Sequence, residues 1–176
     1  MITTDTVKPV IMQLNNLGNV YTFAGPAIGT SLDGAATVDC TLTGMSKKPL
    51  SPILLAASRQ LNNDVTMNWT RRTRVGGSWP TGENGPLSEA YEAYEIDIMA
   101  ANHTTVLRTL TSTTPSVLYT IGHQIADFGS QPNVIEVNIY QMSDWVGRGY
   151  PANLIFHVLD AGASIQANQS TTGAVS

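Results

Sequence analysis

Three arginines, Arg71, Arg72 and Arg74, directly follow a β-like run and carry the clearest chemistry in this sequence. A guanidinium group forms planar, two-bonded pairs with carboxylates, so a cluster of arginines points to ion pairing or to anion binding. The next acidic side chains along the chain are Glu83, Glu89, Glu92 and Glu95. Three interpretations stay open: the arginines fasten their own loop, contact a neighbouring subunit, or bind an anionic ligand such as a surface glycan.

Side chains that could support catalysis or hold a metal are scattered. His103, His123 and His157 fall on different predicted elements, so no metal-ligand spacing occurs. Ser31 lies in a Gly-Thr-Ser-Leu-Asp-Gly run whose second glycine comes one residue too late for a nucleophile elbow. Cys40 is the single cysteine, which excludes an intrachain disulfide and a thiolate cluster. The sequence therefore predicts no enzyme, no cofactor and no metal.

Short strands must position the arginines. Val65, Met67 and Trp69 alternate with polar residues, which is the pattern of a strand with one buried face. Comparable runs occupy residues 53–57, 65–70, 94–98, 106–110, 117–121, 135–140 and 154–158. Residues 122–133 are predicted to be a long loop, and no helical periodicity is visible. Seven short strands in roughly 100 residues, with turn signals between most of them, predict an antiparallel β-sandwich.

The order of features within this sandwich resembles a fibronectin type III domain. A proline precedes the first strand, Trp69 lies near the end of the second, and a Tyr-x-Ile-x-Ile run forms the third. We expect an all-β fold: a fibronectin type III-like seven-stranded antiparallel β-sandwich over residues 49–160, preceded by a β-rich arm. The predicted core residues, which face each other across the two layers, are Met67, Trp69, Tyr94, Ile96, Ile98, Val137 and Ile139.

The segments on either side of the sandwich are less regular. Residues 10–14, 19–23 and 37–43 are β-like, but three short strands make a marginal sheet on their own. Residues 1–48 are therefore either a poorly ordered arm or an arm that pairs with a neighbouring subunit. Residues 47–52 are predicted to be a linker, because two prolines remove backbone donors there. Residues 161–176 are a polar tail, expected to be frayed or in contact with a partner.

One end of the predicted sandwich collects aromatic and basic residues. In a fibronectin-like domain the connections at residues 71–91, 111–116 and 143–152 emerge together. Trp, Tyr and Arg dominate interface hot spots, so this end is a candidate interaction surface. Its residues are Arg71, Arg72, Arg74, Trp79, Trp145, Arg148 and Tyr150, with Tyr91 beside them. The alternative is that Trp79 and Trp145 only cap the core and satisfy their indole N–H groups locally.

The amino-acid composition limits the classes of partner that we expect for this protein. Charged residues make up 12% of the chain, about half the average, and the net charge is −4. This balance gives no general attraction to nucleic acid or to an anionic membrane. No apolar run approaches the roughly 18 residues that span a bilayer, and the first residues lack the pattern of a secretory signal. We expect no nucleic-acid partner and no membrane span.

From residue 49 onward, several blocks resemble one family in the same order. They are residues 69–79 (WTRRTRVGGSW), 86–89 (PLSE), 94–98 (YEIDI), 108–110 (RTL), 114–116 (TPS), 119–120 (YT), 127–129 (DFG), 137–143 (VNIYQMS) and 146–152 (VGRGYPA). These blocks resemble the C-terminal domain of the tail-tip or hub host-specificity proteins of gene transfer agents and related long-tailed bacteriophages. Residues 1–48 are outside the resemblance.

The resemblance implies a structural component of a bacteriophage tail tip, such as a hub, fibre-attachment or minor tail protein of the virion. Its implied partners are other tail proteins, the hub and the fibre, within an oligomeric assembly. The alternative is a receptor-binding module that contacts a host-surface glycan or protein through the connections at 71–91 and 143–152. In that family the block ends a much longer chain, so this chain is either a small separate tail protein or an excised piece. The enzymatic parts of the longer relatives are therefore not carried over.

Overall fold

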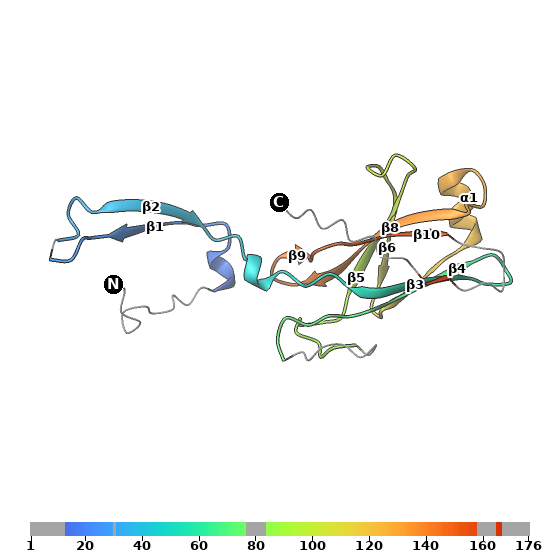
Figure 1. Ribbon diagram of the computed structural model, residues 1–176, viewed down its shortest axis with the longest axis horizontal. Helices are drawn as coiled ribbons and strands as arrows, with labels where there is room; N and C mark the ends of the chain where they lie inside the picture. The colour runs from blue at the N-terminus through green and yellow to red at the C-terminus, as the bar shows by residue number, and fades with distance from the viewer. Residues whose placement is uncertain (1–12, 30, 77–83, 158–164, 167–176) are drawn as a thin grey trace. The chain divides into compact units, whose positions relative to one another are not determined.

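The computed structural model describes residues 13–29, 31–76, 84–157 and 165–166. They form two compact units, Met1–Ser46 and Lys47–Ser176, each described by itself (Figure 1). The first holds η2 (Leu14–Asn16), β1 (Val20–Gly25) and β2 (Ala36–Thr41), and η3 (Met45–Lys47) spans the boundary. The second holds β3 (Ile53–Arg59), β4 (Val65–Thr70), β5 (Tyr94–Met99), β6 (Val106–Ser112), β7 (Ser116–Tyr119), α1 (Ile121–Phe128), β8 (Val134–Ser143), β9 (Gly147–Arg148), β10 (Ala152–His157) and β11 (Ile165–Gln166).

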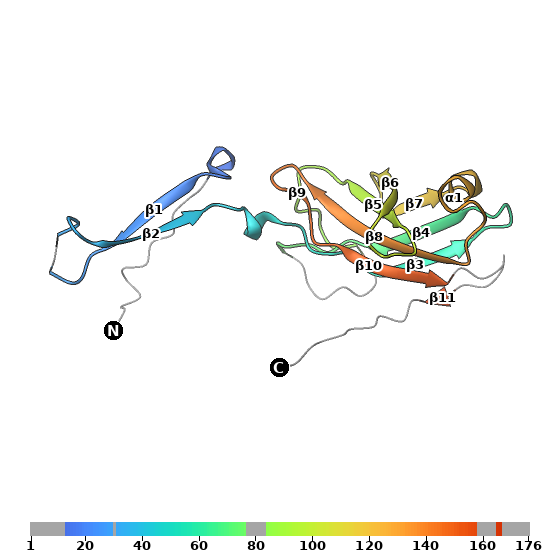
Figure 2. The same ribbon diagram turned by 90° about the horizontal axis from the view of Figure 1, so that it is seen from above.

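The second unit is a two-layer sandwich. One sheet has the order β10-β8-β5-β6, with the short β9 paired to β8, and the other has the order β11-β3-β4-β7. All neighbouring strands are antiparallel. Figure 2 shows the two layers from above. Apart from β9 and β11, this is the strand order of a fibronectin type III domain, so the predicted fold class is confirmed.

Alternation builds the core between the layers. Along β8 every second residue from Ile135 to Ser143 is buried, while the residues between them are only half-buried. The seven core residues predicted from the sequence are all buried: Met67, Trp69, Tyr94, Ile96, Ile98, Val137 and Ile139. The rings of Trp69 and Tyr94 meet edge to face, with centroids 5.0 Å apart and an interplanar angle of 71°. Tyr119, Ile135, Leu154 and Phe156 complete the same cluster.

A helix replaces part of the predicted loop at residues 122–133, so the expectation of no helix is wrong. Thr120 begins α1 as its N-cap, and its hydroxyl accepts a hydrogen bond from the His123 N–H. Gly129 ends the helix in the left-handed conformation at φ 76°, and its N–H donates to the Ile125 carbonyl. The helix is eight residues long and turns one buried side chain, Gln124, toward the sandwich. Such a short helix gives almost no periodic signal in the sequence.

A buried arginine joins α1 to the sheet. Arg59, at the end of β3, donates from Nη1 to the Asn63 carbonyl and to Gln124 Oε1, both at 3.1 Å. Its Nη2 donates to the Pro132 carbonyl at 2.7 Å. The Gln124 amide in turn donates to the Tyr119 carbonyl at 2.9 Å. These bonds tie the β3–β4 turn, α1 and the loop after α1 to one side chain that is only 6% exposed.

An ion pair also holds α1, one turn further along the helix from Gln124. Arg108 on β6 pairs with Asp127 through Nε at 2.7 Å and Nη2 at 2.8 Å. The Tyr119 hydroxyl donates to the same carboxylate at 2.8 Å. Burial alone would raise the pKa of Asp127, but the hydrogen bonds from Arg108 and Tyr119 outweigh it and hold that pKa below its usual value. Burial, with the bond to Asp127, raises the pKa of the Tyr119 hydroxyl.

The described part of the tail is a strand. Two residues of the tail form β11, which pairs with Ala56 and Ala57 of β3. A strand is predicted at residues 10–14. The described part of this run contains no strand, because the 3-10 helix η2 begins at Leu14. Its residues 10–12 lie outside the described part of the chain. The strands predicted at 19–23 and 37–43 are present as β1 and β2.

Replacing Arg59 by methionine keeps the aliphatic stem and removes the guanidinium. We expect a loss of about 2–3 kcal/mol in the free energy of unfolding, because Gln124 Oε1 and two carbonyls lose their donor. Urea denaturation of the purified chain measures this. The control is Ser58→Ala at the exposed neighbouring position, which should change stability by less than about 0.5 kcal/mol. Equal effects of the two variants would contradict the role of this network.

Stability should also fall in acid because of Asp127. A carboxyl whose pKa is lowered by folding contributes stability that is present above its unfolded pKa of about 4, and that is lost as the pH falls through the folded value. Asp127→Asn should therefore be less stable than the parent at neutral pH, and the difference should shrink toward pH 2. Denaturation midpoints across this range measure the effect, with exposed Asp144→Asn as the control. A difference that stays constant with pH would contradict this assignment.

Candidate interaction surfaces

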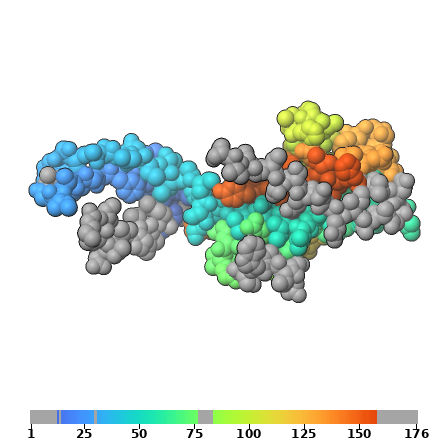
Figure 3. Space-filling model, viewed as in Figure 1, coloured from blue at the N-terminus to red at the C-terminus, as the bar shows by residue number. Residues whose placement is uncertain are grey.

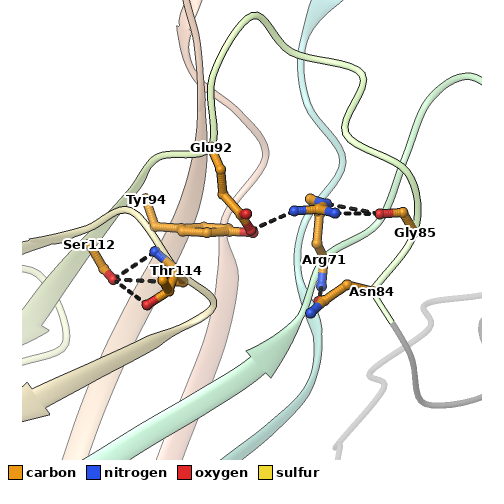
Figure 4. A network of polar contacts seen from close by, with 7 residues as sticks. All are labelled: Arg71, Asn84, Gly85, Glu92, Tyr94, Ser112 and Thr114. Atoms are coloured by element: carbon orange, nitrogen blue, oxygen red, sulfur yellow. Dashed lines mark hydrogen bonds and ion pairs between the residues drawn. The ribbon is translucent and has the colours of Figure 1, made fainter.

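The connection between β4 and β5 is closed by Arg71. Its backbone N–H donates to Asn84 Oδ1 at 2.7 Å, and its guanidinium donates twice to the Gly85 carbonyl, at 3.0 and 2.6 Å. Nη1 lies 2.5 Å from Glu92 Oε1. Figure 4 shows Arg71 between Gly85 on one side and Glu92 with Tyr94 on the other. Arg71 therefore fastens both ends of its own loop.

The network continues into the core. Glu92 Oε1 accepts a hydrogen bond from the Tyr94 hydroxyl at 2.8 Å, so one carboxylate joins the arginine to a buried ring. Burial, with this bond, raises the pKa of the Tyr94 hydroxyl. Beside Tyr94 in Figure 4, the Ser112 hydroxyl donates to the Thr114 carbonyl at 2.8 Å and closes the turn after β6. The polar contacts at this end of the sandwich stabilise its turns.

The other two arginines of the cluster differ. Arg74 pairs with Glu89 Oε1, through Nε at 3.1 Å and Nη2 at 2.6 Å, and the Glu89 side chain is 2% exposed. Arg72 is half-buried and forms no hydrogen bond or ion pair with any described residue. Arg71 and Arg74 thus fit the first interpretation, in which the cluster fastens its own loop. Trp79 and Glu83 lie outside the described residues.

Glu95 does not pair with this cluster, contrary to expectation. It accepts from Arg148 Nε at 2.6 Å, and the two Nη atoms of Arg148 donate to Asp97 at 2.6 and 3.0 Å. The guanidinium also lies over the Tyr140 ring, 4.5 Å from its centroid. Side chains alternate along β5, so Glu95 and Asp97 share the face opposite Tyr94 and Ile96. The short strand β9 carries Arg148 over that outer face, and the bonds to Asp97 raise the pKa of the guanidinium.

Trp145 and Tyr150, predicted for the interaction surface, contact the linker of their own chain. The Lys47 ammonium lies 5.0 Å from the Trp145 ring centroid, and the Lys48 ammonium lies 4.6 Å from that of Tyr150. The Tyr150 N–H donates to the Pro49 carbonyl at 2.9 Å. The predicted linker is therefore held against the turn between β8 and β10.

A shallow, open depression lies where two connections meet beside the ends of β6 and β8 and the start of β5. Its volume is about 540 Å³. It is lined by the end of the β4–β5 connection, the start of β5, the end of β6 with its following turn, and β8: Tyr91, Ala93, Tyr94, Glu95, Thr111, Ser112, Thr113 and Met142. The sequence predicts that certain connections gather at one end of the sandwich. That prediction fits the lining of the depression better than the predicted arginine and tryptophan residues do. Thr111, Thr113 and Met142 belong to no sequence motif. Only the pairing of the predicted strands could have indicated that these residues lie close together.

The ribbon formed by β1 and β2 has two unlike faces. In its register Tyr21 lies opposite Cys40 and Phe23 opposite Val38, which places these side chains on one face. The other face carries Thr22, whose hydroxyl donates to Asp39 at 2.6 Å, together with the Val20–Thr41 and Ala24–Thr37 pairs. Phe23 is 44% exposed and Val38 68% exposed. In Figure 3 the blue strands of the ribbon lie directly at the surface on the side in view.

Comparison with known proteins adds only structural similarity. No protein-family model matches the chain, and no curated protein matches it in sequence. The extracellular domains d3–d4 of rat CD45 are similar in structure at 12% identity and a TM-score of 0.44, over 89% of this chain and 72% of that one. The FN5 domain of Drosophila Lar is similar at 15% identity and a TM-score of 0.37, over 65% of this chain and 99% of that domain.

The described residues offer neither a membrane-spanning helix nor a group of metal ligands. None of the helices there is long and apolar enough to cross a membrane. Within the same ranges no three His, Cys, Asp or Glu side chains group as metal ligands would.

Two glycine substitutions test the packing around the linker. A Cβ on Gly149 would lie 2.8 Å from both the Gln141 and the Pro49 carbonyl oxygens, so Gly149→Ala should destabilise the chain by more than about 2 kcal/mol. The matched control is Gly122→Ala inside α1, where the nearest atom to the new Cβ is 4.0 Å away. That variant should be stabilised, by up to about 1 kcal/mol, because alanine favours the helix. Thermal denaturation of both variants measures the effects, and a neutral Gly149→Ala would contradict the close contact.

Proposed function

We propose that this protein is a structural component of a bacteriophage tail tip, a hub, fibre-attachment or minor tail protein that acts through contacts with other subunits. The observation that supports this proposal most is the ribbon. It offers an apolar face on which Phe23 and Val38 are both exposed. The order of sequence blocks between residues 69 and 152 supplies the setting, because it resembles tail-tip and hub proteins of long-tailed phages.

A two-stranded ribbon gains little from its own contacts. Isolated hairpins are at best marginally stable in water, and at least a third strand or a second layer is needed for independent stability. All residues of β2 are exposed, and only Tyr21 of β1 is not. A surface of another subunit that covers Phe23 and Val38 would supply the missing layer. This chemistry favours an assembly contact over a solitary arm.

The sandwich contributes rigidity to such a component. Its described ionic contacts join elements within the domain: Arg71 with Glu92, Arg74 with Glu89, Arg108 with Asp127, and Arg148 with both Glu95 and Asp97. Side chains engaged in this way hold long connections in one conformation. They are also less free to take part in ionic recognition of a partner, which favours contacts of the apolar kind found on the ribbon.

Incorporation into virions tests the proposal. The pair Phe23→Ser and Val38→Ser removes the apolar face, whereas the conservative pair Thr22→Ser and Thr37→Ser alters only the polar face and keeps its hydroxyl groups. We expect the first pair to abolish incorporation of the chain into tails of the phage that encodes it, and the second pair to leave incorporation unchanged. Mass spectrometry of purified particles measures this. Absence of the parent chain from particles, or normal incorporation of the apolar-face variant, would sink the proposal.

Receptor binding is the second candidate function, and one observation favours it. The depression brings the β4–β5 connection and the β6–β7 turn together, and an exposed ring, Tyr91, lines it. The residues first expected to contact a receptor are engaged elsewhere, because Arg148, Trp145 and Tyr150 have partners within their own chain. If the protein binds a receptor, we therefore expect the contact at the depression and not at those side chains.

A further inference from the structure

We infer that the depression beside β5 is a binding site for a neutral saccharide unit. The inference rests on the second candidate function and names its ligand class. A volume of about 540 Å³ lies in the range of small-molecule sites. The described lining residues include one aromatic ring that is 53% exposed, Tyr91, and one thioether, Met142. A sugar presents an apolar C–H face that packs on such a ring.

Some polar atoms of the lining form no hydrogen bond with a described residue. Glu95 uses Oε2 to accept from Arg148, and its Oε1 has no hydrogen-bond partner among the described residues. Thr111 lies directly opposite Glu95 on β6, so its side chain is on the same face of the sheet. Thr111 and Thr113 are exposed, and their hydroxyls bond no described residue. A carboxylate acceptor beside two hydroxyls, which can donate or accept, matches the hydroxyl groups of a sugar.

Charge selects the class of sugar. None of the described lining residues is basic, and the guanidinium that binds Glu95, that of Arg148, also binds Asp97. An anionic sugar would therefore meet the Glu95 carboxylate without a cation to offset the repulsion. A neutral hexose or an N-acetylhexosamine meets no such cost. The arginine cluster, which first indicated an anionic glycan, does not line this site.

Register explains why the site is preorganised. Glu95 lies between Thr111 on β6 and Tyr140 on β8, and Arg148 stacks on Tyr140 while it holds the Glu95 carboxylate. The carboxylate orientation is thus fixed before a ligand arrives, which lowers the entropy cost of binding. Arg148 acts here as a positioning residue for Glu95.

Titration of the full chain with sugars tests the inference. The probes are glucose, galactose, mannose and N-acetylglucosamine at millimolar concentration, with glucuronic acid as the anionic comparison, followed by amide shifts in NMR. We expect shifts near Tyr91, Glu95 and residues 111–113 with at least one neutral sugar, and none with glucuronic acid. Tyr91→Ala should weaken binding about tenfold or more, and Tyr91→Phe should retain most of it, because the ring is kept.

Further variants separate binding from folding. Thr111→Val keeps the shape of the side chain and removes the hydroxyl, so affinity should fall while the circular dichroism spectrum stays unchanged. Leu118→Ala, at an exposed position on β7 outside the lining, should bind like the parent. No shift with any neutral sugar, equal shifts in Tyr91→Ala, or a preference for glucuronic acid would each overturn the inference. Sugar binding without any effect of Tyr91→Ala on adsorption of phage to host cells would overturn the receptor function while leaving the binding site intact.

Discussion

The register between β5 and β8 is the constraint on which the rest of the sandwich depends. It sets Ile96 opposite Ile139 and Ile98 opposite Val137, so one face of both strands is apolar. The same register sends Glu95 and Asp97 to the outer face, where Arg148 binds both. A slip of one residue would exchange the two faces and place two carboxylates in the core. The cost of burying those charges is what makes this register unique.

The described ionic contacts are few, and they hold connecting segments against the sandwich. With so few charged residues, each pair joins segments that the strands alone would leave loose: the β4–β5 connection, the helix, and the turn that carries β9. Pairs at exposed positions contribute little to stability, but Glu89, Asp97 and Asp127 have nearly buried side chains. Leaving any of these carboxylates without its arginine would cost far more than the pair itself contributes. The network therefore specifies the conformation of the connections more than it adds to overall stability.

The strands were predictable from the sequence and the contacts of their side chains were not. Alternation of apolar and polar residues is a local property, so the runs around Met67, Ile96 and Val137 indicate both the strands and the buried face. The partner of an arginine depends on which connections meet in space, which is why Glu95 was expected near Arg71 and is found with Arg148. The helix α1 is marked only by its caps, Thr120 and Gly129, since eight residues hold too little periodicity. The two-residue strands β9 and β11 carry no pattern at all.

The two units of the chain differ in how they bury apolar side chains. Ordering each residue costs about 1–2 kcal/mol of backbone entropy, and burial of apolar surface must offset it. In the sandwich, alternate residues from both sheets supply that burial, as the fully buried Met67, Ile96 and Ile139 show. The ribbon has the same alternation in its Tyr21–Cys40 and Phe23–Val38 pairs but lacks an opposing layer among the described residues. An apolar face of this kind gains stability when another surface covers it, which is the role that we propose for a neighbouring subunit.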